Sequence, residues 1–183
     1  MKKKPILIGV FVIFLGIGGY IAYRVLSSRP LSPAQTITHN YQGLDIKLNY
    51  CSPLKRGRLI FGEAKDGALV PYGKYWRMGA NEATEITFSK DVKFMGNPLK
   101  AGSYRMYAVP TDSLWTISLN SELGKWGYDE PNYSLDVLKV DVPVKVLATV
   151  TEQFTMKFYN DSTGVDMNID WDHAHLSVPI KVQ

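Results

Sequence analysis

The C-terminal part of the chain alternates between apolar and polar residues, and this pattern constrains the fold more than any other feature. Apolar residues occupy every second position in three runs, Phe154–Phe158, Val165–Trp171 and Ala174–Val182. Successive side chains of a β-strand point to opposite faces of a sheet, so a period of two predicts strands with one buried face. The connections 160–164 and 172–173 have hairpin length, which predicts three antiparallel neighbours.

Similar strand-like segments recur earlier in the chain, and glycine, proline or asparagine residues mark several of the turns between them. These segments are Leu44–Tyr50, Glu85–Ser89, Val92–Met95, Ser103–Val109, Leu114–Asn120 and Leu135–Val146. In the last of them Pro143 predicts an edge or a bulge, because proline cannot donate to a sheet ladder. About 8–10 short strands predict an all-β fold, an antiparallel β-sandwich or a partly closed barrel. Outside the N-terminal segment, only Asn132–Leu138 has helical character, of one or two turns.

The N-terminus has the pattern of a membrane anchor. Residues 1–4 form a basic end, and residues 5–23 are 19 consecutive uncharged positions, almost all apolar. This length approaches the roughly 20 residues of a membrane-spanning helix and exceeds the h-region of a cleaved signal peptide. We therefore predict a single-pass signal anchor over residues 5–26, with a linker over residues 27–33.

The distribution of charge predicts the orientation of this anchor and excludes one class of partner. Lys2–Lys4 outweigh Arg24 and Arg29, which predicts a cytoplasmic N-terminus and an extracytoplasmic domain over residues 34–183, periplasmic or on the cell surface. Five of the 21 Lys and Arg residues lie in residues 1–30, which contain no acidic residue. The remaining 16 basic residues face 17 acidic ones, so we expect no nucleic-acid partner.

The single cysteine limits the covalent and metal chemistry of the chain. Cys51 has no partner for an intrachain disulfide and cannot build a cysteine metal cluster. His173 and His175 alternate on one strand face and could reach one ion, but His39, the remaining histidine, is remote in the sequence. We expect an exposed polar face here, with no metal and no cofactor.

The segment Leu69–Thr84, LVPYGKYWRMGANEAT, has the composition of a functional loop. Proline and glycine shape its backbone, and aromatic and charged side chains are concentrated in it. Arg77 offers a planar fork of donors for a carboxylate, a sugar hydroxyl pair or a peptide terminus, and Asn81 and Glu82 offer directional partners. The alternative is that Arg77 and Glu82 pair with each other and fix the loop.

Aromatic side chains complete the candidate ligand-binding set. Tyr72 and Trp76 add stacking area within the segment, and Trp126 lies in a second aromatic loop, LGKWGYDEP. The expected ligand-binding residues are Tyr72, Trp76, Arg77, Asn81, Glu82 and Trp126. No catalytic residue is assigned, because the chain contains no nucleophile elbow, P-loop, dinucleotide fingerprint or HExxH motif.

Three stretches carry a resemblance to a known family. The runs GRLIFG, LVPYGKYWRMGANEAT and NPLKAGSYRMYAVP resemble an uncharacterised family of exported bacterial domains known as domain of unknown function 2911. The likeness extends roughly from Ser32 to Ile180. It implies a β-rich exported domain and supplies no activity.

Three functions are consistent with these observations. We expect a membrane-anchored binding module, without enzymatic activity, for a small molecule, a glycan or an envelope partner. One alternative is a hydrolase or metal-dependent enzyme that uses His173 or His175. The other is a structural or assembly protein of the cell envelope that pairs through exposed strand edges.

Overall fold

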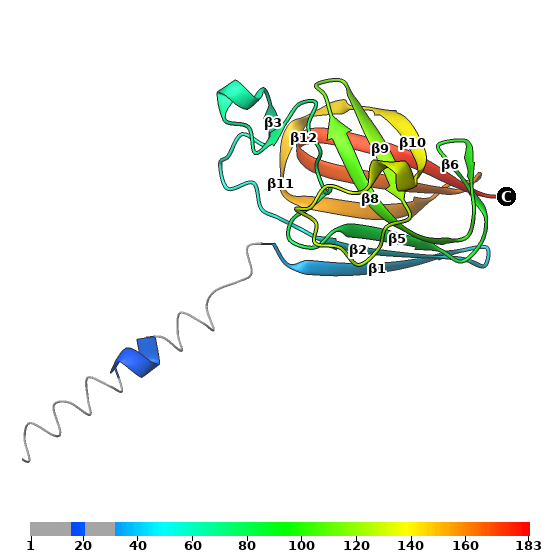
Figure 1. The fold of residues 1–183 in the computed structure, drawn as a ribbon, viewed down its shortest axis with the longest axis horizontal. Helices are drawn as coiled ribbons and strands as arrows, with labels where there is room; N and C mark the ends of the chain where they lie inside the picture. The colour runs from blue at the N-terminus through cyan, green and yellow to red at the C-terminus, as the bar shows by residue number, and fades with distance from the viewer. Residues whose placement is uncertain (1–15, 21–31) are drawn as a thin grey trace, which may run out of the picture. The chain divides into compact units, whose positions relative to one another are not determined.

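Two antiparallel sheets face each other across one hydrophobic core in the computed structural model, which describes residues 16–20 and 32–183 (Figure 1). The larger sheet contains β1 (Ala34–Tyr41), β2 (Leu44–Cys51), β5 (Thr84–Phe88), β8 (Gly102–Pro110), β9 (Leu114–Asn120) and β10 (Asp136–Pro143), in that spatial order. The smaller sheet contains β11 (Lys145–Asn160), β12 (Val165–Val182), β6 (Val92–Phe94) and β7 (Asn97–Leu99), in that order.

Short elements connect these strands. β3 (Phe61–Gly62) and β4 (Val70–Pro71) form a small parallel pair, and η1 (Ala64–Asp66) and η2 (Tyr133–Leu135) are single 3-10 turns. The predicted all-β, sandwich-like fold is confirmed. Within the described residues no closed barrel is formed. The helical turn predicted within Asn132–Leu138 is present as η2.

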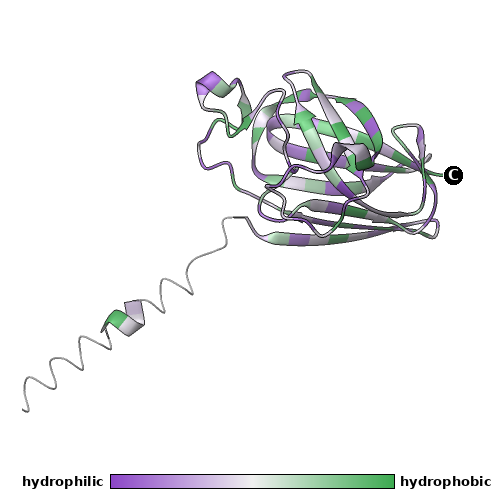
Figure 2. Ribbon diagram, viewed as in Figure 1, coloured by the Kyte–Doolittle hydropathy of each residue, from purple (hydrophilic) through white to green (hydrophobic). Residues whose placement is uncertain are grey.

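Alternation along the strands places the apolar side chains between the two sheets, and Figure 2 shows the resulting alternation of colour along the ribbons. In β2, for example, Leu44, Ile46 and Leu48 are buried, while Asp45 and Lys47 are exposed. The outer face of the larger sheet is consequently polar along β1, β2 and β5.

An aromatic cluster occupies the centre of the core. Trp76 packs edge-on against Trp115 and stacks on Trp171, with ring centroids 5.4 and 5.7 Å apart. Phe61 packs against all three indoles, and Phe154 packs against those of Trp76 and Trp171. Large rings carry much of the apolar area of a core, so this cluster connects the irregular segment 54–80 to both sheets.

The prediction of three C-terminal neighbours is wrong in one respect. β11 and β12 form the predicted hairpin, but β12 continues through residues 172–173 and ends at Val182. Asp172 has a left-handed φ of 55°, which inserts a bulge into the strand. The buried positions therefore change from odd numbers, ending at Trp171, to even numbers, beginning at Ala174. In a sequence, a turn between two strands produces the same change in the alternation, which is why a hairpin was predicted here.

Pro143 is the last residue of β10, and Lys145 begins β11, so the segment predicted as one strand, Leu135–Val146, is divided between the two sheets. This position suits proline, which cannot donate a ladder hydrogen bond. The predicted anchor, residues 5–26, lies outside the described residues except for 16–20, which are helical. Among the described residues no helix has the length and hydropathy needed to cross a membrane.

Candidate functional site

The segment between β4 and β5 is held against β8 by main-chain hydrogen bonds. The N–H of Trp76 donates to the carbonyl of Ala108, and the N–H of Ala108 donates back, both at 2.8 Å. Glycine is required at position 79, where φ is 148° and a Cβ would lie 2.6 Å from the carbonyl oxygen of Cys51. The composition of this segment therefore reflects its close packing on its neighbours.

Two of the six predicted ligand-binding residues lie apart from the others. Trp76 is 6% exposed and belongs to the central aromatic cluster, so its ring packs the core. Tyr72 lies at the start of the segment, where its N–H donates to the carbonyl of Gly62. Its phenol has a raised pKa because of burial and the nearby carboxylates of Asp112 and Glu63.

The other four predicted residues are brought together by the loop that connects β9 to β10, residues 121–135, which we call the 121–135 loop. Glu82 and Trp126 form an antiparallel bridge, and the N–H of Gly127 donates to the carbonyl of Asn81 at 3.1 Å. Gly127 also packs on the side chain of Arg77, because a Cβ at that position would lie 2.5 Å from Arg77 Cδ. We call Arg77, Asn81, Glu82 and Trp126 the Arg77 site.

Arg77 has an unused hydrogen-bonding capacity. Its Nε is buried and makes no hydrogen bond, and its terminal nitrogens reach solvent without a partner among the described residues. A buried polar group without a partner costs free energy, so it is exceptional in a folded protein. The alternative that Arg77 pairs with Glu82 is not realised, since no salt bridge joins them.

Glu82 instead accepts a hydrogen bond from the thiol of Cys51, with Sγ 3.1 Å from Oε2. This bond holds the pKa of Glu82 below its usual range. Burial, followed by the same carboxylate, raises the pKa of the Cys51 thiol. The thiolate is the nucleophilic form of cysteine, so Cys51 is a structural donor that orients Glu82 and not an activated nucleophile.

The aromatic side chains of the 121–135 loop are open to solvent. Trp126 is 52% exposed and Tyr128 is 76% exposed. Asn81, which has a left-handed φ of 55°, reaches Ser32 at the start of the domain with its side-chain amide. The Arg77 site therefore combines a free guanidinium edge with an exposed indole.

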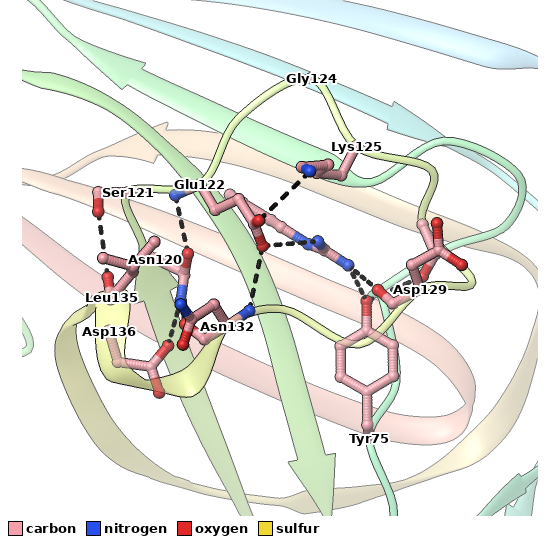
Figure 3. Close-up of polar contacts among 12 residues, drawn as sticks. Tyr75, Asn120, Ser121, Glu122, Gly124, Lys125, Asp129, Asn132, Leu135 and Asp136 are labelled. Carbon is pink, nitrogen blue, oxygen red and sulfur yellow. Dashed lines mark hydrogen bonds and ion pairs between the residues drawn. The ribbon is translucent and has the colours of Figure 1, made fainter.

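A second arginine, Arg105 of β8, lies beneath the same loop and fixes it to the sheet. Its side chain is 1% exposed, and its Nη2 donates to the Tyr75 hydroxyl at 2.6 Å and to the carbonyl of Asp129. The Tyr75 hydroxyl in turn donates to the carbonyl of Gly127 at 2.8 Å. Figure 3 shows Tyr75 and Asp129 meeting at this point. Burial raises the pKa of Tyr75, although Arg105 opposes the shift.

The two ends of the 121–135 loop are held by side-chain amides and carboxylates (Figure 3). Asn120 donates to Asp136 Oδ1 at 2.7 Å and to the carbonyl of Asn132, and Glu122 accepts from the N–H of Asn132 at 3.1 Å. Burial raises the pKa of Asp136, but the hydrogen bonds from Asn120, Lys139 and Tyr107 outweigh it and lower the pKa overall.

Sequence reasoning missed Arg105 and the residues that hold the loop ends. Arg105 occupies an outward position of β8, between the buried Tyr104 and Met106, and such a charge ordinarily predicts exposure. It is buried because the 121–135 loop folds over the outer face of the sheet. One feature of the sequence could have indicated that the loop packs on the sheet. The loop contains more glycine, proline and aromatic residues than a simple hairpin connection needs.

The three histidines do not converge. His39 of β1 stacks on Phe158 and its Nε2 lies 2.7 Å from Asn160 Oδ1. In β12, His173 Nδ1 lies 2.8 Å from the carbonyl of Leu147, and His175 Nδ1 lies 2.7 Å from Asp170 Oδ1. In the part of the chain that the structure describes, no three His, Cys, Asp or Glu residues are placed to hold a metal ion.

The side chains of the Arg77 site provide groups that can bind a small ligand. A guanidinium fork provides parallel N–H donors for a planar anion, and an exposed indole provides a stacking surface. The adjacent carboxylate of Glu82 adds an acceptor.

One of the three comparisons with known proteins gives a match. No curated protein and no solved structure is significantly similar to the chain. The family model described as "Protein of unknown function (DUF2911)" matches residues 32–180, nearly all of the β domain. The chain therefore belongs to the DUF2911 family.

Proposed function

We propose that this protein is a binding module whose Arg77 site takes a small ligand that carries a carboxylate and an aromatic or other flat apolar group. The module is held outside the cytoplasm by the N-terminal segment 5–26. The observation that carries the proposal is the guanidinium of Arg77, which has a buried Nε and outer nitrogens without partners beside the exposed Trp126.

The geometry of Arg77 favours a carboxylate. Two donors of one guanidinium match the two oxygens of a carboxylate, and the resulting bidentate pair is among the stronger hydrogen-bonded contacts in proteins. A doubly charged phosphate is less suitable, because the Glu82 carboxylate stands in the same site and the domain as a whole is not basic. A single negative charge meets less of this repulsion.

Trp126 and Tyr128 provide the surface on which the flat apolar group of the ligand can pack. Both rings are exposed at the tip of a loop whose backbone is fixed by Arg105 and Tyr75. A ring in the ligand can pack against such a side chain and remove apolar area from water. The preorganised backbone limits the entropy lost on binding.

A thermal-shift experiment on the full-length chain, in a detergent without sugar or carboxylate, tests this proposal. The probes are phenylacetate, acetate and phenylacetamide, which separate the carboxylate from the ring. We expect phenylacetate to raise the melting temperature most, acetate less, and phenylacetamide least. At ten times the dissociation constant the stabilisation is about 1.4 kcal/mol, or roughly 3–6 °C for a domain of this size.

The variants Arg77→Met and Trp126→Ala should abolish and reduce the phenylacetate shift, respectively. Arg56→Met is the matched control, because Arg56 is also an arginine on an irregular segment and its side chain is exposed. The proposal is rejected if all three probes give the same shift, or if Arg77→Met retains the phenylacetate shift of the unmodified chain.

A further inference from the structure

A concave surface lies on the outer face of the larger sheet, over β1, β2 and β5, which lie side by side in Figure 1. The side chains that face this outer-face pocket are polar, and all but that of Lys47 are short: Thr38, Asn40, Asp45, Lys47, Thr87 and Ser89. Its volume is about 500 Å³. Small-molecule sites commonly measure about 300–1,000 Å³, so the pocket has the capacity for a ligand of two sugar rings.

Strand pairing arranges these side chains in two rows across the sheet. Lys47 pairs with Thr38 on one side and with Thr87 on the other. Asp45 pairs with Asn40, and its N–H donates to the hydroxyl of Ser89 at 2.8 Å. Neighbouring strands are about 4.7–4.9 Å apart, so a pyranose-sized ring can contact both neighbours of β2 at once.

Part of this polar surface is already satisfied within the sheet. Asn40 donates to Asp45 Oδ1 at 2.7 Å, and the Thr87 hydroxyl lies 2.8 Å from that of Ser103. The Lys47 ammonium and the Thr38 hydroxyl make no hydrogen bond or ion pair with the described residues. These free groups are donors, and the second carboxylate oxygen of Asp45 is a free acceptor.

We propose that the outer-face pocket binds an uncharged saccharide. Sugar hydroxyls both donate and accept, which matches one free ammonium, one free hydroxyl and one free carboxylate oxygen in a single surface. The charges of Lys47 and Asp45 cancel, so the pocket has no excess of donors for a phosphate or other strong anion. The threonine methyl groups and the Lys47 stem offer apolar atoms to the C–H faces of a sugar ring.

This site is separate from the Arg77 site, and its test is independent of the proposed function. The full-length ¹⁵N-labelled chain, in a detergent without a sugar headgroup, is titrated with cellobiose, maltose, lactose and sucrose while amide resonances are followed by NMR. Alanine is titrated as a zwitterion that could use Lys47 and Asp45 without any saccharide chemistry. We expect at least one disaccharide to bind with a dissociation constant of roughly 1–10 mM and to shift the amides of Thr38, Lys47 and Thr87.

Three variants decide whether the polar groups carry the binding. Lys47→Met, which keeps the apolar stem, should weaken binding about tenfold or more, and Thr38→Val should weaken it about two- to tenfold. Lys93→Met is the matched control, because Lys93 is an exposed strand lysine on the smaller sheet. Arg77→Met should leave disaccharide binding unchanged.

Either of two results overturns the proposal. One is that no disaccharide binds below about 10 mM, or that alanine alone shifts these amides. The other is that Lys47→Met and Thr38→Val bind the disaccharide as tightly as the Lys93→Met control does.

Discussion

The packing of Gly127 against the central segment permits a sharp test of how the Arg77 site is built. In Gly127→Ala the new Cβ would lie 2.5 Å from Arg77 Cδ, 2.5 Å from the Asn81 carbonyl oxygen and 2.7 Å from the Glu82 carbonyl oxygen. Two of these three atoms belong to the backbone, so a change of side-chain rotamer cannot relieve the collision. Gly127 is not among the residues with a left-handed φ, so the alanine itself adds no backbone strain.

The expected loss of unfolding free energy follows from the two ways in which the chain can respond. If the 121–135 loop stays in place, overpacking costs about 1–3 kcal/mol. If the loop moves away, the Gly127 hydrogen bonds to Asn81 and Tyr75 are lost, at about 0.5–1.5 kcal/mol each. The restriction of the unfolded chain by alanine offsets about 0.4–1 kcal/mol. The net destabilisation is therefore expected to lie at about 0–2.6 kcal/mol, with a central value of about 1.3 kcal/mol.

Urea unfolding followed by tryptophan fluorescence measures this loss. Gly62→Ala is the matched control, because Gly62 also lacks a left-handed φ and its Cβ would meet only side-chain atoms of Leu59 and Ala68, at 3.3 Å or more. The control should change the free energy of unfolding by less than about 1 kcal/mol. If Gly127→Ala is no more destabilising than Gly62→Ala, the 121–135 loop does not pack on Arg77 as described, and the construction of the site is refuted.

Three further predictions concern the anchor, the thiol and the response to acid. Fractionation with protease protection should find the intact chain in the membrane with residues 34–183 accessible from the extracytoplasmic side; a mature chain that lacks residues 1–26 would contradict the anchor. Cys51 should react slowly with iodoacetamide in the native state, and Glu82→Gln should speed the reaction, because the carboxylate helps to raise the thiol pKa; an unchanged or slower rate would show that the contact has no effect. The folded-state pKa of Asp136 is depressed, so its contribution to stability is present above the unfolded value of about 3.9 and is lost as the pH falls through the folded value. Between pH 5 and pH 2 the urea midpoint of the unmodified chain should therefore fall further than that of Asp136→Asn. Equal decreases would show that Asp136 does not contribute to the loss of stability in acid.

The strands could be predicted from the sequence because their pattern depends on local geometry. β9 was predicted with its observed bounds, and β2 and β5 to within one residue, since alternation between core and solvent is written into each strand. The hairpin predicted at Asp172 was wrong for a related reason. A bulge changes the phase of the alternation without reversing the chain, and both events look alike in a single sequence.

The candidate site could be predicted only in part, because it depends on contacts between distant segments. Arg77, Asn81 and Glu82 are close in sequence, but their meeting with Trp126 depends on where the 121–135 loop lies. Trp76 was expected beside them, yet the backbone places its side chain in the core. Composition can identify an aromatic residue in a loop, but it cannot identify the face on which that residue lies.

The most direct test of the Arg77 site follows the Nε–Hε resonance of Arg77 by ¹H–¹⁵N NMR while phenylacetate is added. The resonance is assigned by its disappearance in Arg77→Lys. Arg105 is an internal reference, because its Nε is also buried and without a hydrogen bond, but its guanidinium is held by Tyr75 and Asp129. We predict a saturable shift of the Arg77 resonance with little change at Arg105. An Arg77 resonance that does not move, or that moves no more than that of Arg105, would contradict the binding of a carboxylate at this site.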